Sequence, residues 1–414
     1  MDPTSLSRED RAILTLESET IAGHTAKIIG IGPGAAGVDR LGELIEGRIE
    51  RVPELTRMLD DSGAEPRWID APRFELADHL SAAAIDAPVA GHEVPGLVAD
   101  LFATRLPRDR PLWRIDVIPI DDGGQVLVWR IHHALADGTA STRFARELLW
   151  DPDAPLGPVS HARARAALDD ERRRRHLLGV LRREFARSRD GSPFDGEVGL
   201  RRQIAFAVAP LRELHDVARE RADATLNDAV LSVLAGALGR WMRAHHGDLG
   251  QIRVKIPVSL HHEGDQVANH DSFFSVPLPL NEPDPITRLW DVQMATSQRK
   301  HDRDAEELDE LSRGLARISP HLASFCTRVE ASPRRFALNV SNVPGPKRPV
   351  AVDGVGVRAL HSIAEIGEHH ALRVSVISCA DELFFGFCAD PSIVADLDAM
   401  ATGVRAEVDA LLAA

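Results

Sequence analysis

The sequence has no tyrosine, three cysteines and only four lysines among its 49 basic residues. Without tyrosine, no phenol is available as an acid, a base or a nucleophile. The cysteines are far apart and form no Cys-x-x-Cys pair, so we expect neither a disulfide framework nor a metal site, and a reducing compartment. No uncharged apolar run approaches the roughly 18 residues of a membrane span, and the N-terminus lacks an apolar signal core. These absences predict a cytoplasmic protein that is at most peripheral to a membrane.

Acidic residues outnumber basic ones by 63 to 49, which gives a formal charge of −14. Affinity for nucleic acid comes mostly from clustered Lys and Arg, so this balance argues against a general nucleic-acid binder. It also argues against unaided attraction to anionic membranes. The 414 residues, 44% of them hydrophobic and 27% charged, have the composition of a globular protein with two or three domains.

A change in composition divides the chain. Residues 156–198 hold an arginine-rich stretch with turn-forming residues at both ends, which predicts a charged helical connector. Nearby acidic residues favour a solvated helix face over a patch for RNA or lipid headgroups. We therefore predict an N-terminal lobe at 1–155 and a C-terminal lobe at 199–414. Strand-like and helix-like segments mix in both without a strict βαβ order, which predicts two α/β (α+β) lobes with mixed sheets.

Periodicity locates the elements that matter most for function. Strands are expected over 25–32, 115–119 and 124–131, and helices over 41–59, 139–149, 211–221, 227–244 and 392–412. A hairpin is expected between strands 372–379 and 383–388, with Ala380 and Asp381 at its turn.

The string HHALADG, at residues 132–138, follows one of these strands. Side chains alternate faces along a strand, so one of the two histidines ends an apolar stripe and can point into a dry cavity. Asp137 or Thr139 is placed to cap the helix that follows, and Gly138 permits a tight turn. A neutral imidazole at a strand end, with a carboxylate four residues on, suits a general base. A core histidine beside a helix cap is the alternative.

Two other patterns have ordinary explanations. Adjacent histidine pairs also occur at 245–246, 261–262 and 369–370, but they border turns or a helix end and lack the spacing of a zinc site. A Gly-x-Gly-x-x-Gly string at 32–37 resembles a dinucleotide fingerprint. No strand ending in an acidic residue follows about 20 residues on, so we do not predict NAD binding.

The string at 132–138 resembles the HHxxxDG signature of the coenzyme A-dependent acyltransferase superfamily, which includes chloramphenicol acetyltransferase and nonribosomal peptide condensation domains. Five further strings resemble those of bacterial wax ester synthase/acyl-CoA:diacylglycerol acyltransferases. They are WIDAPRFELADHL at 68–80, LPRDRPLW at 106–113, ATLNDAVL at 224–231, IPVSL at 256–260 and SNVPGP at 341–346. Their order and spacing agree from about residue 7 to residue 412, so the resemblance covers nearly the whole chain.

This resemblance implies two chloramphenicol-acetyltransferase-like lobes with an active-site tunnel between them. The implied reaction moves a fatty acyl group from acyl-CoA to diacylglycerol or a long-chain alcohol, with no covalent acyl-enzyme and no cofactor besides acyl-CoA as co-substrate. His133 would be the general base in a catalytic motif that includes His132 and Asp137, and Asp137 would pair with an arginine behind the loop. The implied substrate-binding residues are Gly138, Asn227, Asp228, Trp113 and Asn342.

Several alternatives stay open at this stage. Asn227 could donate to the developing oxyanion or cap its helix, and Trp113 could pack the lobe. The acyl donor could be carried on a carrier protein, or the chain could be a lipid-binding homologue without turnover. The chain also departs from the family where it has Ser378-Cys379-Ala380-Asp381 for SYxG, His261 for an arginine, Ala268 for a glycine and Gly23-His24 for MH. These departures leave the acceptor open, and the sequence does not determine the acyl-chain length or the oligomeric state.

Overall fold

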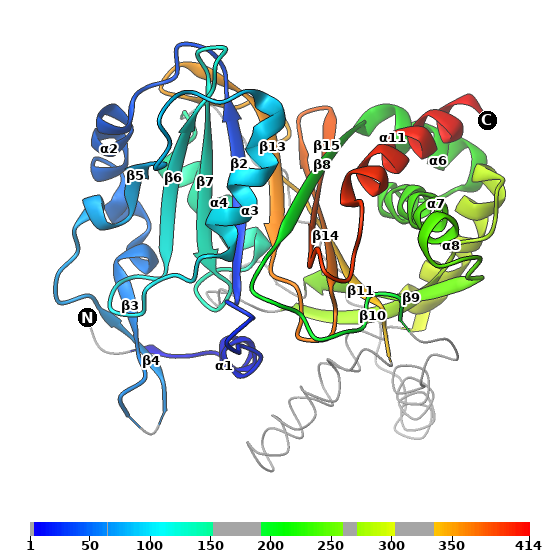
Figure 1. The fold of residues 1–414 in the computed structure, drawn as a ribbon, viewed down its shortest axis with the longest axis horizontal. Helices are drawn as coiled ribbons and strands as arrows, with labels where there is room; N and C mark the ends of the chain where they lie inside the picture. Colours follow the sequence, from blue (N-terminus) through cyan, green and yellow to red (C-terminus); the bar gives the residue numbers. More distant parts are fainter. Residues whose placement is uncertain (1–3, 64, 152–191, 260–270, 303–334) are drawn as a thin grey trace.

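The computed structural model describes residues 4–63, 65–151, 192–259, 271–302 and 335–414. The chain forms two halves that lie side by side in Figure 1, each built around a six-stranded sheet. Both sheets mix parallel and antiparallel neighbours, so the predicted α/β lobes with mixed sheets are confirmed. A small three-stranded sheet, β1-β4-β3, lies beside the N-terminal half.

The N-terminal sheet has the order β12-β13-β2-β7-β6-β5. Its strands are β2 (His24–Ile31), β5 (Leu80–Ala82), β6 (Trp113–Pro119), β7 (Gln125–His132), β12 (Ala351–Val352) and β13 (Val355–Ala364). The last two come from the C-terminal part of the sequence, and β13 pairs antiparallel with β2. The predicted boundary at residue 199 therefore does not separate the two sheets. An alternating pattern shows that a segment forms a strand but not which strand it pairs with.

Shorter elements surround this sheet. They are β1 (Thr4–Ser5), α1 (Arg8–Thr15), α2 (Val38–Glu46), β3 (Arg57–Asp60), β4 (Arg67–Asp70), α3 (Val94–Ala103) and α4 (Gly138–Leu148), with single 3-10 turns at Ile49–Arg51, Pro53–Thr56, Leu76–Asp78 and Gly91–Glu93. The single helix predicted over 41–59 was wrong, because α2 ends at Glu46. Gly47 is a weak helix former, and Pro53 lacks an N–H and disfavours helical geometry at the residue before it.

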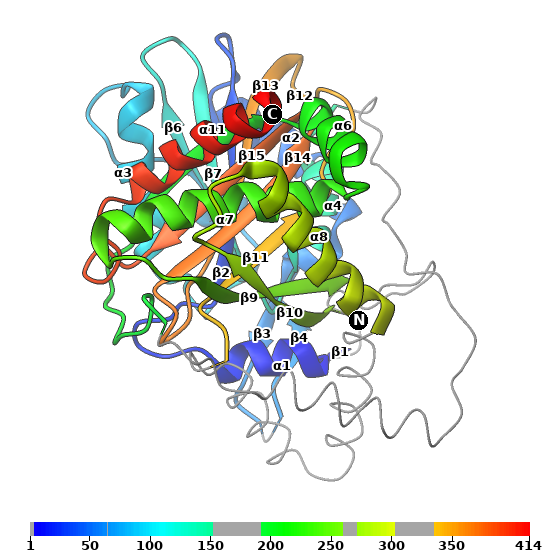
Figure 2. The ribbon, with the colours of Figure 1, turned by 90° about the vertical axis from the view of Figure 1, so that its right-hand side faces the viewer.

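The C-terminal sheet has the order β10-β9-β11-β14-β15-β8. Its strands are β8 (Gln203–Pro210), β9 (Gln251–Ser259), β10 (Asp271–Pro279), β11 (Leu338–Val343), β14 (Leu372–Cys379) and β15 (Glu382–Ala389). Helices α6 (Leu211–Ala222), α7 (Leu226–His245), α8 (Pro285–Asp302) and α11 (Leu397–Ala413) complete this half. Figure 2 shows α7, α8 and α11 in front of the sheet. The predicted hairpin with Ala380 and Asp381 at its turn is confirmed.

The side chains of β14 alternate between two cores, so this strand connects the two halves. Val374 and Val376 pack into the large core that includes α7 and α11, whereas Ile377 and Cys379 pack into the core of the N-terminal half. The second face of the C-terminal sheet is thus buried against the N-terminal half. Most of the predicted connector at 156–198 lies outside the described residues. Among the described helices, none combines the length and apolar character that a membrane span requires.

The turn at residues 32–37 joins β2 to α2. β2 runs antiparallel to both of its neighbours, β7 and β13. A dinucleotide-binding fingerprint requires a glycine turn between a strand of a parallel sheet and its crossover helix. The geometry around this turn therefore does not match a Rossmann site.

Candidate active site

The HHALADG string occupies the turn between β7 and α4. His132 is the last residue of β7, and its carbonyl accepts the N–H of Leu135 at 2.9 Å, which closes the turn. Asp137 is the N-cap of α4, and its carboxylate accepts the N–H of Ala140 at 2.6 Å. Asp137 is buried, with 1% of its surface exposed. Of the two predicted caps, Asp137 and Thr139, it is Asp137 that satisfies a backbone donor of the first helical turn.

The two histidines have different surroundings. Both ring nitrogens of His132 make contacts, since Nδ1 accepts the N–H of Ala134 at 3.2 Å and Nε2 lies 3.1 Å from Oε1 of Glu17. His132 is 3% exposed, whereas His133 retains a larger exposed surface. The N–H of His133 donates to the carbonyl of Gly23 at 2.9 Å. Of the two histidines, His133 is the more exposed residue.

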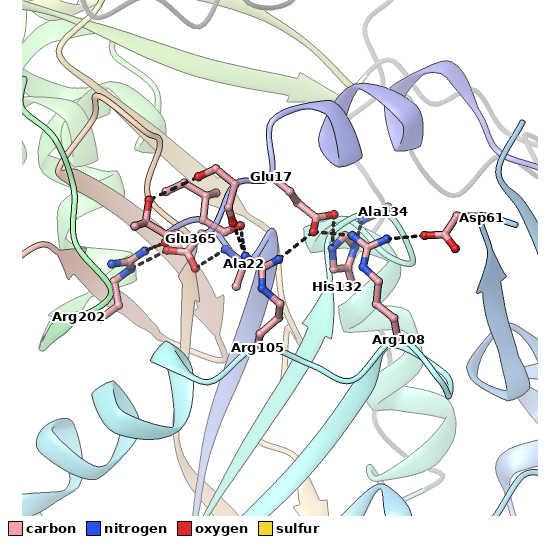
Figure 3. Close-up of polar contacts among 12 residues, drawn as sticks. Glu17, Ala22, Asp61, Arg105, Arg108, His132, Ala134, Arg202 and Glu365 are labelled. Atoms are coloured by element: carbon pink, nitrogen blue, oxygen red, sulfur yellow. Dashed lines mark hydrogen bonds and ion pairs between the residues drawn. The ribbon is translucent and has the colours of Figure 1, made fainter. Parts of the chain in front are cut away.

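Glu17, in the loop between α1 and β2, is a site residue that the sequence did not reveal. Its side chain is 8% exposed, and Oε2 accepts hydrogen bonds from Arg105 at 3.0 Å and Arg108 at 2.6 Å (Figure 3). Burial alone would raise the pKa of Glu17, but its interactions with His132 and Arg108 outweigh burial and lower the pKa below its ordinary value. Glu17 is therefore held as a carboxylate against the first histidine.

Burial makes His133 a neutral imidazole. Removal from water, and to a smaller extent the positive charge of Arg373, lowers the pKa of His133 to about 4, although its own backbone and Asp137 oppose the shift. Arg373 lies on β14 of the other half and donates to the carbonyl of Glu365 at 3.0 Å. At neutral pH the ring therefore carries no charge and has a lone pair that can accept a proton.

A buried lysine lies near the carboxylate of the motif. Lys27 of β2 is 3% exposed, and its Nζ donates to Oγ of Ser362 in β13 at 3.3 Å. Burial lowers the pKa of Lys27 to about 8, and the negative charge of Asp137 opposes that shift. The resemblance implied an arginine near Asp137, and the structure places this lysine within reach of its charge.

The second half of the molecule meets the motif at Gly138. A Cβ atom on Gly138 would lie 2.8 Å from Cγ2 of Val343, the last residue of β11. The preceding residue, Asn342, donates from Nδ2 to Oδ1 of Asn227 at 3.4 Å. Gly138 thus packs against Val343 across the junction of the two halves, and the neighbouring Asn342 bonds Asn227 within the C-terminal half.

The other two predicted substrate-binding residues have structural surroundings. Asp228 accepts hydrogen bonds from the N–H of Thr225, the N-cap of α7, at 2.8 Å and from the hydroxyl of Thr296 at 2.6 Å, so it completes the capping box of α7 and ties this helix to α8. Trp113 is 1% exposed, and its indole N–H donates to the carbonyl of Leu55 at 2.7 Å. Its ring also stacks on His79. Packing, the alternative that the sequence left open for Trp113, is the role that these contacts support.

The described residues offer no candidate metal centre. Within the described ranges, no group of three or more His, Cys, Asp or Glu side chains could hold a metal ion. Of the other histidine pairs, His245 stacks on Trp241 at the end of α7, and His369 lies 3.3 Å from Asp195. The pair at 261–262 lies outside the described residues.

Comparison with known proteins identifies the family. A model of the wax ester synthase/diacylglycerol acyltransferase (WS/DGAT) catalytic domain matches residues 6–183, and a model of the WS/DGAT C-terminal domain matches residues 267–411. The chain belongs to the WS/DGAT family. It is therefore an acyltransferase. A protein of Mycobacterium tuberculosis named as a probable diacylglycerol O-acyltransferase, tgs1, is 27% identical over 391 residues, which cover 85% of this chain and 82% of that protein.

Solved structures show the same WS/DGAT fold. The wax ester synthase/diacylglycerol acyltransferase of Marinobacter aquaeolei VT8 is 18% identical and aligns with a TM-score of 0.73, over 99% of this chain and 98% of that one. The first condensation domain of the calcium-dependent antibiotic synthetase aligns with a TM-score of 0.65 at 16% identity, over 100% of this chain and 97% of that one. The predicted two-lobed acyltransferase fold is thereby confirmed.

Proposed function

We propose that this WS/DGAT protein transfers a fatty acyl group from acyl-CoA to the hydroxyl of diacylglycerol or of a long-chain alcohol, with His133 as the general base. Family membership supports acyl transfer to a hydrophobic alcohol. The observation that carries the finer proposal is the state of His133, a neutral imidazole on a partly exposed residue beside the junction of the two halves. We propose that donor and acceptor meet at this junction, through a tunnel between the lobes.

The reaction needs one proton carrier. His133 removes the proton from the acceptor hydroxyl as its oxygen attacks the thioester carbonyl, and a carbon–oxygen bond forms in a tetrahedral intermediate. When this intermediate collapses, the carbon–sulfur bond breaks and the imidazolium returns the same proton to the thiolate of coenzyme A. The products are an ester and free coenzyme A, with no acyl-enzyme. Acid–base catalysis of this kind contributes about 10²- to 10⁴-fold.

The low pKa of His133 keeps the ring unprotonated before the reaction, although it also makes the imidazole a weaker base. A pKa of about 4 leaves the ring unprotonated at neutral pH, so it is ready to accept the hydroxyl proton. The imidazolium formed is then a strong acid, which favours delivery of the proton to the leaving thiolate. Arg373 places a positive charge in reach of the ring, and the same charge favours the anionic oxygen of the intermediate.

We also propose a cytoplasmic location with peripheral contact to a membrane or lipid droplet. One apolar patch supports this contact, because Trp290 and Met294 lie one turn apart on α8 and are 46% and 66% exposed. The net charge of −14 makes apolar contact the more favourable mode on an anionic surface.

The test is a His133→Ala variant, assayed by release of free thiol from palmitoyl-CoA in the presence of diacylglycerol or long-chain alcohols. We expect release that depends on the acceptor in the parent protein, and a loss of about 100-fold or more in the variant. His246→Ala, a substitution in another histidine pair at the exposed end of α7, is the matched control and should retain parent activity. Substantial transfer by folded His133→Ala protein would exclude His133 as the base.

The same assay separates the alternatives. If the protein released no thiol from palmitoyl-CoA but transferred an acyl group from an acyl-carrier protein, the donor would be the carrier protein and not acyl-CoA. Lipid binding without thiol release from either donor would instead indicate a homologue that lacks turnover.

A further inference from the structure

One loop contacts both histidines of the motif. This loop, residues 16–23, runs from α1 to β2. Glu17, near its start, bonds the ring of His132, while the carbonyl of Gly23, at its end, accepts the backbone N–H of His133. The loop is far from the motif in sequence, yet it fixes a side chain on one histidine and the main chain of the other. We call it the clamp loop.

The contacts of His132 define how its ring is held. Nδ1 accepts the N–H of Ala134, so that nitrogen carries no proton. Nε2 therefore carries the ring proton, and this N–H donates a hydrogen bond to Oε1 of Glu17. A ring fixed in this way holds the amide of Ala134, which directly follows His133. Glu17 thus restrains the peptide on one side of His133, and Gly23 restrains it on the other.

Two arginines hold Glu17 in place and balance its charge. Arg105 donates to Oε2 of Glu17 and also to the carbonyls of Ser18 and Ile21, so it binds the clamp loop at three points. Arg108 donates to the same Oε2 and lies 3.4 Å from Asp61. A buried carboxylate that accepts several charged hydrogen bonds has little freedom to rotate.

The other end of the clamp loop is anchored at the junction of the two halves. Glu365, directly after β13, accepts the N–H of Ala22 at 3.4 Å and the Nε–H of Arg202 at 2.7 Å. Arg202 also donates to the carbonyl of Thr20. Figure 3 shows these contacts as one continuous set from Arg202 to His132. The clamp loop therefore has few alternative positions.

We propose that Glu17 is a positioning residue for acyl transfer, which acts through His132 to hold His133 in its reactive orientation. This inference rests on the proposed function, because it assumes that His133 is the base. Glu17 takes no part in proton transfer, since both of its oxygens are engaged by His132 and the two arginines. Its removal should therefore lower kcat and leave acyl-CoA binding intact.

The first experiment compares Glu17→Ala, Glu17→Gln and Glu19→Ala. Loss of the carboxylate frees the His132 ring, and misplacement of a reacting group by about 1 Å costs about 100-fold, so we expect kcat of Glu17→Ala to fall about 10- to 100-fold. KM for palmitoyl-CoA should stay within about twofold of the parent value. Glu17→Gln keeps an acceptor oxygen and should lose less. Glu19→Ala removes an exposed carboxylate from the same loop and should match the parent.

The second experiment tests whether Glu17 acts through His132. If Glu17 works through His132, the double variant Glu17→Ala/His132→Ala should lose no more activity than His132→Ala alone, because coupled residues are not additive. Folding is checked by circular dichroism, and Glu17→Gln serves if Glu17→Ala does not fold. Parent-like kcat in a folded Glu17 variant, or losses that multiply in the double variant, would overturn the inference.

A spectroscopic measurement separates this inference from the proposed function. The parent protein is labelled with ¹⁵N-histidine, and the His132 signal is assigned as the one missing from the spectrum of His132→Ala. In the parent, this signal should report the Nε2–H tautomer alone. In Glu17→Ala, His132 should no longer be held in that single tautomer. If the parent protein released no thiol from any donor, the proposed function would fail while this measurement still tested the contact. An unchanged His132 tautomer and ring signal in Glu17→Ala would contradict the clamp.

Discussion

Gly23 is the residue at which the clamp loop comes closest to the histidine motif. Its φ of +69° lies in the left-handed region that favours glycine. A Cβ atom there would lie 3.0 Å from Nε2 of His132 and 3.0 Å from Cγ of Glu17. Glycine is thus required at this position both by its backbone conformation and by the two side chains that meet beside it.

Substitution of Gly23 by alanine should affect activity more than stability alone can explain. Gly34→Ala is the matched control, because Gly34 also has a positive φ, +87°, but a Cβ atom there would have no neighbouring atom within 4 Å. Both variants should lose about 1 to 2 kcal/mol of unfolding free energy from backbone strain, measured by urea denaturation. Only Gly23→Ala should also lose most of its thiol-release activity. Equal activity in the two variants would contradict a steric role for Gly23.

For single residues, the sequence predicted contacts within one short string better than contacts between residues that are far apart in the chain. The spacing in HHALADG limited the helix cap to Asp137 or Thr139, because a cap acts within one helical turn, and the structure has Asp137 in that role. Glu17 lies 115 positions from His132, and no local pattern marks that contact. The resemblance pointed to Asp228 and Trp113 because they lie in family strings, but such strings contain packing residues as well as binding residues.

Among the elements, the β14–β15 hairpin supports the end of β11 that meets the motif. Ser378 accepts the N–H of Gly345 at 3.0 Å, and the N–H of Ala380 donates to the carbonyl of Pro346 at 2.8 Å. The hairpin thereby holds the SNVPGP turn that follows Asn342. Ala380 has a φ of +51°, a left-handed conformation that is unfavourable for alanine.

Ala380→Gly should therefore stabilise the protein. Relief of left-handed strain exceeds the extra entropy that glycine gives the unfolded chain, so we expect a gain of about 0.5 to 1 kcal/mol. Ala406→Gly, at an exposed position inside α11, is the control and should lose about 1 kcal/mol because glycine is a poor helix former. Thermal unfolding of both variants measures the difference. A loss of stability in Ala380→Gly would contradict strain at this turn.

Elements with strong periodicity were predicted to within a few residues, including β2, β7, α4 and α7. The failure at 41–59 occurred where apolar spacing continued through Gly47 and Pro53, and backbone chemistry ended the helix. The pairing of β13 with β2 could not be predicted, because the local sequence of a strand does not select its partner.

For the whole molecule, the ion pair of Arg202 and Glu365 is a buried contact at the junction of the two halves. Their side chains are 2% and 5% exposed. Burial raises the pKa of Glu365 above its ordinary value, although Arg202 opposes this shift. The folded state therefore binds a proton on Glu365 more tightly than the unfolded state does, and that contribution to stability declines as the pH rises through the raised pKa.

Arg202→Met should destabilise the protein in a pH-dependent way. Without Arg202, ionised Glu365 would be a buried charge with less compensation, so we expect a loss of about 3 to 5 kcal/mol at about pH 8. The loss should be smaller at about pH 5, where a Glu365 with a further raised pKa binds a proton. The double variant Arg202→Met/Glu365→Gln is the control and should recover stability at the higher pH. A loss that does not vary with pH would contradict a charge effect.

The pairing of β13 with β2 also constrains how this protein can be made. During synthesis from the N-terminus, β7 is made soon after β2 and can pair with it. The other edge of β2 stays uncovered until residues 355–364, which form β13, have been made. Until then, unpaired backbone groups line an apolar strand beside the histidine motif, which is a template for wrong pairing. The active site can therefore mature only when nearly the whole chain has been made, and expression of the first 155 residues alone should yield an aggregation-prone fragment.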